Sequence, residues 1–174
     1  EGVFLKSGNI EWIEKLDCLT DLHVHLDGSL SLESVRHLAD MQNIETGDDD
    51  KLIRKLSVSS DCKDLNEYLE KFEFPLQLLQ TREAVKYSVC QLVKEQEEQG
   101  IIYSEIRFAP QLHTRNGLSQ QEIVEAACEG LDESGKYWKP YSCHNLILCC
   151  MRSDNNRCEN METVRLAALY AEKK

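Results

Sequence analysis

Residues 20–28 carry two histidines and an aspartate at a spacing that suits metal binding. The segment reads TDLHVHLDG, which places His23, His25 and Asp27 two positions apart. Side chains alternate between the faces of a β-strand, so in an extended segment these three point to one side. The apolar residues of the segment then point to the other side: Leu22, Val24 and Leu26. Neutral imidazole is the commonest protein ligand for zinc. The pattern predicts an open catalytic site that needs one more protein ligand, and two surface histidines on an edge strand are the alternative.

Apolar strands that alternate with amphipathic helices make up the rest of the chain. Further strands are expected at about residues 101–110 and 145–152, and the acidic residues 48–50 are expected to open a short helix. A last helix is expected from about residue 160 onward. Helix starts are marked by three N-caps, one of them in a capping box: Ser31, Thr81, and Ser119 with Glu122. This order indicates three βα units and a parallel sheet.

The segment 64–80 carries an apolar stripe at helical spacing, which Phe74-Pro75 is expected to interrupt. The stripe consists of Leu65, Tyr68, Leu69, Phe72 and Leu76. Stripes of this kind usually pack into the interior of a protein, so the residue pattern by itself predicts that these side chains belong to the core.

Composition and charge restrict the partners of the chain. Its 174 residues have a formal net charge of −11 and a pI near 4.9, so a nucleic-acid backbone or an anionic membrane would repel it. No apolar run approaches the ~20 residues of a membrane span, and residues 1–6 lack the plan of a signal peptide. An intracellular, cytoplasmic protein without nucleic-acid or membrane partners is expected, although a chain that starts without Met can have been trimmed.

The eight cysteines are scattered and form no Cys-x-x-Cys motif. Several fall within apolar periodic segments, where thiols behave as small core residues, so they are expected to be reduced and structural. The missing motif also excludes the cytidine deaminase type of zinc site.

Three segments resemble the adenosine deaminase family, a group within the zinc-dependent amidohydrolases. HVHLDGSL at 23–30 resembles its first barrel strand, IIYSEIRFAP at 101–110 its second and ILCCMR at 147–152 its third. The resemblance runs from about Ile10 to Lys174. Three segments in the right order are far more specific than a single His-x-His. The resemblance implies a TIM (β/α)8 barrel, of which this chain holds the amino-terminal part, with about three βα units and a helical lid insert.

The resemblance also implies roles for residues of the first strand and the insert. His23 and His25 would be zinc ligands, Asp27 would accept a hydrogen bond from a ribose hydroxyl, and Gly28 would allow close approach of the backbone. Leu69 and Phe72 of the lid insert become candidate gate residues over the substrate. The implied reaction is zinc-dependent hydrolytic deamination of adenosine, and of deoxyadenosine, to inosine and ammonia, in purine salvage. An aspartate rather than a glutamate at position 27 favours a nucleoside over free adenine, and its charge disfavours a nucleotide.

Other polar residues are expected to be structural. The three remaining histidines do not match the family's motifs, and they are His37, His113 and His144. Of these, His113 alone lies near the expected mouth of the barrel. Glu105 and Arg107 share a face of the second strand and are expected to form ion pairs within the barrel. The family's remaining metal ligands and its catalytic residues would lie beyond Lys174, so no catalytic residue is assigned within this chain.

A complete barrel needs eight βα units and about 250 residues, so residues 1–174 are expected to be the amino-terminal portion of one hydrolase domain. The chain stops at Lys173-Lys174, a dibasic end such as a trypsin-like cut would leave. The carboxyl-terminal portion is therefore expected to be present as a second polypeptide in the same particle. A truncated chain is the alternative explanation. Two other functions stay open. A metal-dependent phosphoesterase of the polymerase-and-histidinol-phosphatase type also begins with a strand like residues 21–29, and the chain could be a non-catalytic fragment.

Overall fold

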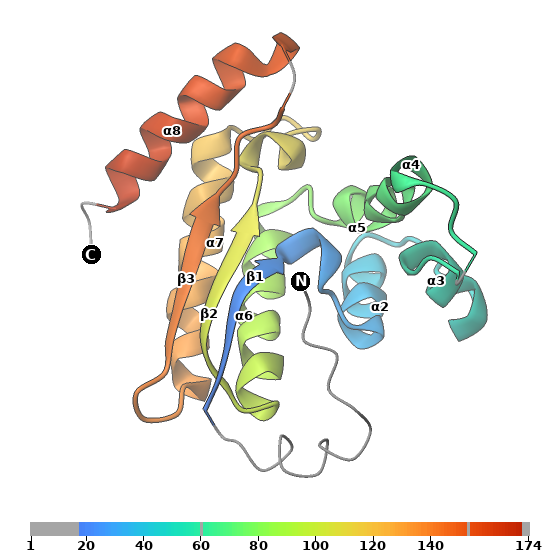
Figure 1. The fold of residues 1–174 in the computed structure, drawn as a ribbon, viewed down its shortest axis with the longest axis horizontal. Coiled ribbons are helices and arrows are strands. Elements are labelled where there is room, and N and C mark those ends of the chain that lie inside the picture. The colour runs from blue at the N-terminus through green and yellow to red at the C-terminus, as the bar shows by residue number, and fades with distance from the viewer. Residues whose placement is uncertain (1–17, 60, 153, 172–174) are drawn as a thin grey trace.

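The computed structural model describes residues 18–59, 61–152 and 154–171, and they form a parallel three-stranded sheet with helices between the strands (Figure 1). The strands lie in the order β1-β2-β3, and their bounds are Leu19–His25, Ile101–Phe108 and Cys143–Leu148. The ends of the chain lie outside this range, and with them Ile10 and the Lys173-Lys174 pair. The expected parallel sheet of three βα units is confirmed.

Seven α-helices connect or follow the strands in the described part of the chain. They are α2 (Leu32–Met41), α3 (Asp49–Leu56), α4 (Leu65–Leu69), α5 (Glu73–Leu78), α6 (Arg82–Glu98), α7 (Gln120–Ser134) and α8 (Arg157–Ala171). Short 3-10 turns mark the connections: η1 (Leu26–Gly28), η2 (Glu70–Phe72), η3 (Pro110–His113), η4 (Gly135–Tyr137) and η5 (Asp154–Asn156).

The helix starts follow from local hydrogen bonding. The side chains of Ser31 and Thr81 each accept a bond from a backbone amide of the first turn, as expected for N-caps. Ser119 and Glu122 form both bonds of the capping box. These polar side chains satisfy amides that the helices leave unpaired, so the three starts were readable from the sequence.

One face of the sheet packs against α6 and α7 and holds the core (Figure 1). On β2 the side chains of Ser104, Ile106 and Phe108 are buried toward these helices. The intervening residues of β2 point to the other face, which is only half-buried, and they are Tyr103, Glu105 and Arg107. Two chemically different faces therefore arise from simple alternation along one strand.

The stripe of residues 64–80 does not form one core helix. Leu65 is 67% exposed and Leu69 is 52% exposed, and only Leu76 of the stripe is buried. Residues 65–72, here called the lid segment, stand away from the sheet (Figure 1), whereas the next helix, α5, has the buried residues Pro75, Leu76 and Leu78. The core prediction is therefore wrong for the first part of the stripe.

Pro75 does not interrupt the helical pattern. It occupies the third position of α5, where its missing N–H has no partner to lose within the helix. The irregular stretch is η2 instead, directly before α5.

His144 belongs to a buried polar chain on the core face of the sheet. Its Nε2 lies 2.8 Å from Glu97 Oε1, and its Nδ1 lies 2.7 Å from Ser104 Oγ. All three residues are almost completely buried, so no substrate can reach this serine–histidine–carboxylate arrangement. It joins α6 to β2 and β3, which confirms the structural interpretation of His144.

His113 is fully buried in η3, where its Nδ1 donates to the carbonyl oxygen of Leu79 across 2.9 Å. Burial lowers the pKa of His113 to about 4, from an ordinary value of 6.5. As the pH falls from 6.5 toward 4, the unfolded chain takes up a proton that the folded chain does not. We expect this histidine to remove about 3 kcal/mol of stability over that interval.

The measurement is the free energy of unfolding of the wild type and of His113→Asn between pH 7 and pH 4. The asparagine amide retains a donor for Leu79, so the variant should lose less stability on acidification by about 3 kcal/mol. Acid effects elsewhere, including any loss of metal, are common to both proteins and cancel in the difference. Identical pH dependence in the two proteins would show that His113 is not the responsible group.

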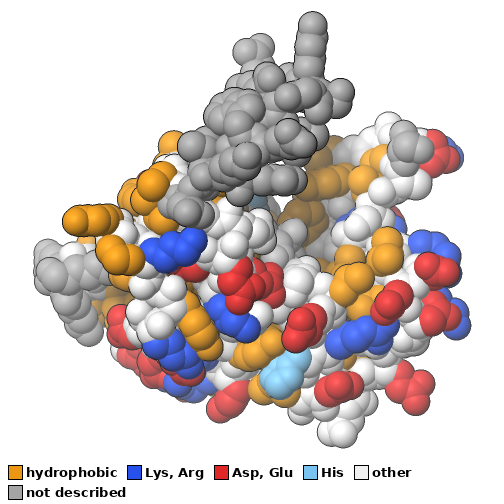
Figure 2. All heavy atoms as spheres, turned by 90° about the horizontal axis from the view of Figure 1, so that it is seen from below, with side chains coloured by type: hydrophobic (Ala, Val, Ile, Leu, Met, Phe, Trp, Pro, Cys, Tyr) orange, Lys and Arg blue, Asp and Glu red, His pale blue; other side chains and the backbone are white. Residues whose placement is uncertain are grey.

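The cysteines and the surface agree only in part with expectation. None of the eight cysteines forms a disulfide in the described structure, but Cys90 alone is buried, so most of them are not core residues. Acidic and basic side chains are interspersed on the face seen from the beginning of the strands (Figure 2). No helix among the described residues is long and apolar enough to cross a membrane.

Candidate metal centre and adjoining pocket

His23 and His25 lie at the carboxyl-terminal end of β1, on the face away from the core helices. The pairing of β1 with β2 is irregular between Asp21 and Val24, and Asp21 Oδ1 accepts a hydrogen bond from the His23 amide. This irregularity changes the alternation that the sequence predicts. Val24 is buried as expected, but Leu22 is 57% exposed.

The two imidazoles converge on one point. Their Nε2 atoms are 3.2 Å apart and their ring centroids 5.2 Å apart. Two nitrogens at zinc–nitrogen distances of about 2.0–2.1 Å in tetrahedral geometry are separated by about 3.3–3.4 Å. The pair therefore has the spacing of two ligands of one tetrahedral ion, and the residues present fit zinc.

Asp27 follows the strand in η1, not within β1, and it still lies beside His25. Its Oδ1 is 3.9 Å from His25 Nδ1 and is buried without a hydrogen-bond partner in the described structure. Burial raises the pKa of Asp27, and the charge of His25 opposes that shift. Burial lowers the pKa of His25, which favours the neutral imidazole that binds metals.

The described residues supply only part of a metal site. Within them, no group of three or more histidine, cysteine, aspartate or glutamate side chains is arranged to hold a metal ion. A catalytic zinc site needs three protein ligands and an open position. This part of the chain can contribute two of these ligands.

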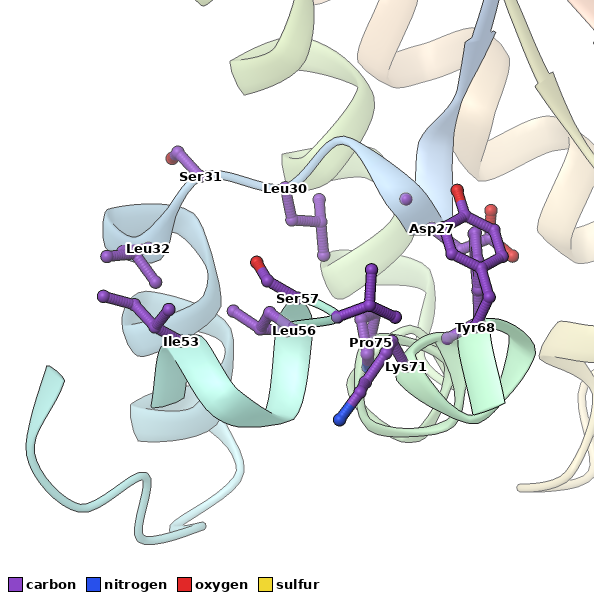
Figure 3. Close-up of a pocket in the computed structure, with 13 residues that line it drawn as sticks. Asp27, Leu30, Ser31, Leu32, Ile53, Leu56, Ser57, Tyr68, Lys71 and Pro75 are labelled. Atoms are coloured by element: carbon purple, nitrogen blue, oxygen red, sulfur yellow. The ribbon is translucent and has the colours of Figure 1, made fainter. Parts of the chain in front are cut away.

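A pocket of about 590 Å³ adjoins Asp27 (Figure 3). Asp27 and Tyr68 lie at one end of it, and Ser31, Leu32 and Ile53 lie at the other. It is lined by residues of η1, α2, α3, the lid segment and α5, with the intervening connections: Asp27, Gly28, Leu30, Ser31, Leu32, Ile53, Leu56, Ser57, Val58, Tyr68, Lys71, Phe72 and Pro75. The lining combines apolar side chains with polar and charged groups, and small-molecule sites use such polar groups to orient a ligand.

Three of the four residues expected to bind substrate line this pocket. Gly28 faces the ring of Phe72 so closely that a Cβ at position 28 would lie 2.8 Å from Phe72 Cε1. Only glycine fits there without displacing the ring. Leu69 is not among the lining residues and is half-exposed. Its role as a gate residue stays a prediction.

Sequence reasoning missed the contribution of α3 to the pocket. Ile53 and Leu56 reach the pocket from a short helix that the sequence predicted only from its acidic start at residues 48–50. Tyr68 was visible as part of the apolar stripe, and its ring contacts Phe72 edge-on at 5.5 Å between centroids.

Neither Glu105 nor Arg107 forms one of the expected barrel ion pairs within the described residues. Arg107 donates from Nη2 to the carbonyl oxygen of Leu22 at 3.5 Å, while its Nε is buried without a hydrogen-bond partner there. Glu105 accepts a hydrogen bond from Tyr103. Both charged residues share the half-buried face of the sheet, as predicted, but each has a different partner.

Comparison with known proteins connects this geometry to a family. The family model for adenosine deaminase matches residues 18–174. The chain is 46% identical over 155 residues to an adenosine deaminase of Haemophilus ducreyi, covering 88% of this chain and 45% of that protein. It is 40% identical over 156 residues to an adenosine deaminase of Clostridium acetobutylicum, covering 87% of this chain and 45% of that protein. The chain thus spans about half the length of these relatives.

Solved structures share the fold of this chain over a similar fraction of their own length. Arabidopsis ADAL in complex with IMP matches with a TM-score of 0.69 and 25% identity, over 91% of this chain and 47% of that one. Adenine deaminase from Arthrobacter aurescens matches with a TM-score of 0.67 and 22% identity, over 87% and 45%. An amidohydrolase from Burkholderia ambifaria with bound Zn matches with a TM-score of 0.64 and 9% identity, over 98% and 54%. The fold is the amino-terminal part of a TIM barrel, and the chain belongs to the adenosine deaminase family.

Proposed function

We propose that this chain forms the amino-terminal part of a zinc-dependent deaminase that converts adenosine and deoxyadenosine to inosine or deoxyinosine and ammonia. The observation that carries the proposal is the 3.2 Å separation of the Nε2 atoms of His23 and His25 at the end of β1. Active sites of TIM barrels lie at this end of the strands. The family match and the names of the curated relatives support the choice of reaction.

His23 and His25 would hold the zinc ion, and the remaining ligands would come from later strands. Bound zinc supplies Lewis acidity that makes water nucleophilic near neutral pH. The role of β1 is to hold both imidazoles at fixed spacing, because a rigid pair of ligands avoids reorganisation when the metal binds. The groups that protonate the purine and orient the water are proposed to lie in the part of the barrel beyond residue 174.

Asp27 would recognise the sugar of the nucleoside. Its buried Oδ1 has no hydrogen-bond partner among the described residues, and a ribose 5′-hydroxyl would supply the missing donor. A carboxylate at this position repels a 5′-phosphate, so we propose a nucleoside rather than a nucleotide as the substrate.

The lid segment would cover the bound nucleoside. Tyr68, Leu69 and Phe72 present apolar side chains that the protein does not bury in its core, and Phe72 lies directly over Gly28. Exposed apolar side chains beside a pocket are typical of ligand-binding surfaces. Leu69 would become buried when the lid segment closes on a nucleoside.

The partner of this chain would be the carboxyl-terminal portion of the barrel, as a second polypeptide in the same particle. Within the described structure β1 and β3 are the edges of the sheet, and such edges are normally paired or covered. We place the enzyme in the cytoplasm. The polymerase-and-histidinol-phosphatase alternative is not proposed, because the family match and the relatives favour deamination.

The deciding experiment uses a preparation that contains both portions of the barrel, checked by intact mass under denaturing conditions, and loaded with zinc. Inosine and ammonia should form from adenosine in equal amounts, and removal of zinc with a chelator should stop the reaction. Failure to deaminate either nucleoside would refute the proposal. Release of phosphate from phosphoesters, with two or more metals bound, would favour the phosphoesterase instead.

A further inference from the structure

The lid segment is attached to the rest of the protein mainly at its carboxyl-terminal end. Neither α4 nor η2 contains a buried residue, whereas the next helix, α5, buries Pro75, Leu76 and Leu78. Lys71 adds one hydrogen bond, from its Nζ to the carbonyl oxygen of Arg54. Phe72 therefore lies at the junction between a loosely held segment and a well-packed helix.

An ion pair lies at this junction. Both terminal guanidinium nitrogens of Arg115 donate to the carboxylate of Glu73, with Nη1–Oε1 at 2.5 Å and Nη2–Oε2 at 3.2 Å. Glu73 directly follows Phe72, and Arg115 comes from the loop after β2. A bidentate arginine–carboxylate pair fixes the direction of the carboxylate as well as its distance.

The loop that carries Arg115 is itself fastened to α5. The Arg115 amide donates to Gln80 Oε1 at 2.9 Å, and Gln80 Nε2 donates to the carbonyl oxygens of Leu76 and Leu112 at 2.6 and 2.9 Å. His113 donates to the Leu79 carbonyl from the same loop. These hydrogen bonds hold the backbone of Arg115 in place after β2. The ion pair of its guanidinium with Glu73 therefore couples the position of the lid segment to that of β2.

Phe72 is in contact with the candidate site. Its ring lies edge-on to the imidazole of His25, with 6.4 Å between centroids, and packs over Gly28. A shift of Phe72 would open the pocket beside Asp27, because both residues line it.

We propose that Arg115 is a positioning residue which, through its ion pair with Glu73, holds Phe72 over His25 and Gly28 and so keeps the carboxyl-terminal end of the lid segment beside the nucleoside site. The inference rests on the proposed function. Exposed ion pairs add little to global stability, and both partners are substantially exposed here. The effect of Arg115 is therefore local, on substrate binding rather than on folding.

The test reverses the charges in the complete zinc enzyme. Arg115→Glu and Glu73→Arg should each raise KM for adenosine about fivefold with kcat changed by less than about twofold, because Phe72 is released from the substrate pocket while neither metal ligand is substituted. The double variant restores an opposite pair and should return KM to within about twofold of the wild type. Arg115→Ala, which avoids a second carboxylate at the junction, should show a smaller increase.

Hydrogen exchange of residues 65–72 provides a reading that does not depend on activity. Exchange should accelerate about fivefold in each single variant and recover in the double variant. Lys136→Glu is the matched control, since Lys136 forms an exposed ion pair with Glu133 at the opposite end of the sheet, and it should change neither KM nor exchange in the lid segment.

Unchanged KM and unchanged exchange in Arg115→Glu would overturn the inference, as would a double variant no better than the single ones. A wild-type enzyme without deaminase activity would instead refute the proposed function. The exchange measurement would still decide whether Arg115 holds the lid segment.

Discussion

His23→Ala and His25→Ala are each expected to remove zinc and deaminase activity together from the complete enzyme. The two Nε2 atoms are 3.2 Å apart, so they can share one ion, and either substitution leaves a single nitrogen from this strand. We expect kcat/KM to fall by about 10³–10⁴-fold, since the Lewis acid of the reaction is lost. The measurements are the steady-state rate of inosine formation and the zinc content of the purified protein.

The matched control is His37→Ala. His37 lies on α2 with its ring 4.3 Å from that of Tyr87, away from the metal site, and its loss should leave the zinc content and kcat/KM nearly unchanged. Full zinc occupancy and normal turnover in His23→Ala or His25→Ala would contradict the assignment of these residues. Normal zinc content with lost turnover would mean that they act on the substrate rather than on the metal.

Asp27→Asn is expected to reduce kcat/KM for adenosine about 10–100-fold. The substitution keeps the size of the side chain but replaces a charged acceptor with a neutral one, and hydrogen bonds to charged groups contribute about 1.5–3 kcal/mol. If the partner is the 5′-hydroxyl, the loss should be much smaller with 5′-deoxyadenosine, which lacks that donor. The measurement compares both substrates in both proteins as a cycle.

Asp50→Asn serves as the control for this substitution, because Asp50 is an exposed aspartate of α3 that does not line the pocket. It should leave both substrates unaffected. Equal losses of kcat/KM for adenosine and 5′-deoxyadenosine in Asp27→Asn would show that Asp27 acts through the structure around His25, which lies 3.9 Å away, and not through the ribose.

Short-range patterns allowed much of the fold to be predicted from the sequence. The caps at Ser31, Thr81 and Ser119 bind amides within three residues of themselves, so their neighbours in the chain suffice to predict them. The same is true of His23 and His25, because alternation along one strand brings them together without help from the rest of the protein. The predictions were correct for features that depend on residues only a few positions apart in the sequence.

Strand ends and exposure were less well predicted. β3 begins at Cys143 and ends at Leu148, earlier than the expected range of 145–152, because pairing with β2 sets its register. Leu22 is exposed because the irregular pairing of β1 with β2 changes the alternation, and no pattern within β1 alone records this.

The sequence by itself determined the order of three βα units, the helix starts and the two convergent imidazoles, because these depend on residues close together in the chain. Only the tertiary structure decided that residues 65–72 stand away from the core, that α3 lines the pocket, and that Arg115 reaches Glu73. The last pair is separated by 42 positions. Such contacts depend on how whole elements pack against one another, and local spacing carries no information about that packing.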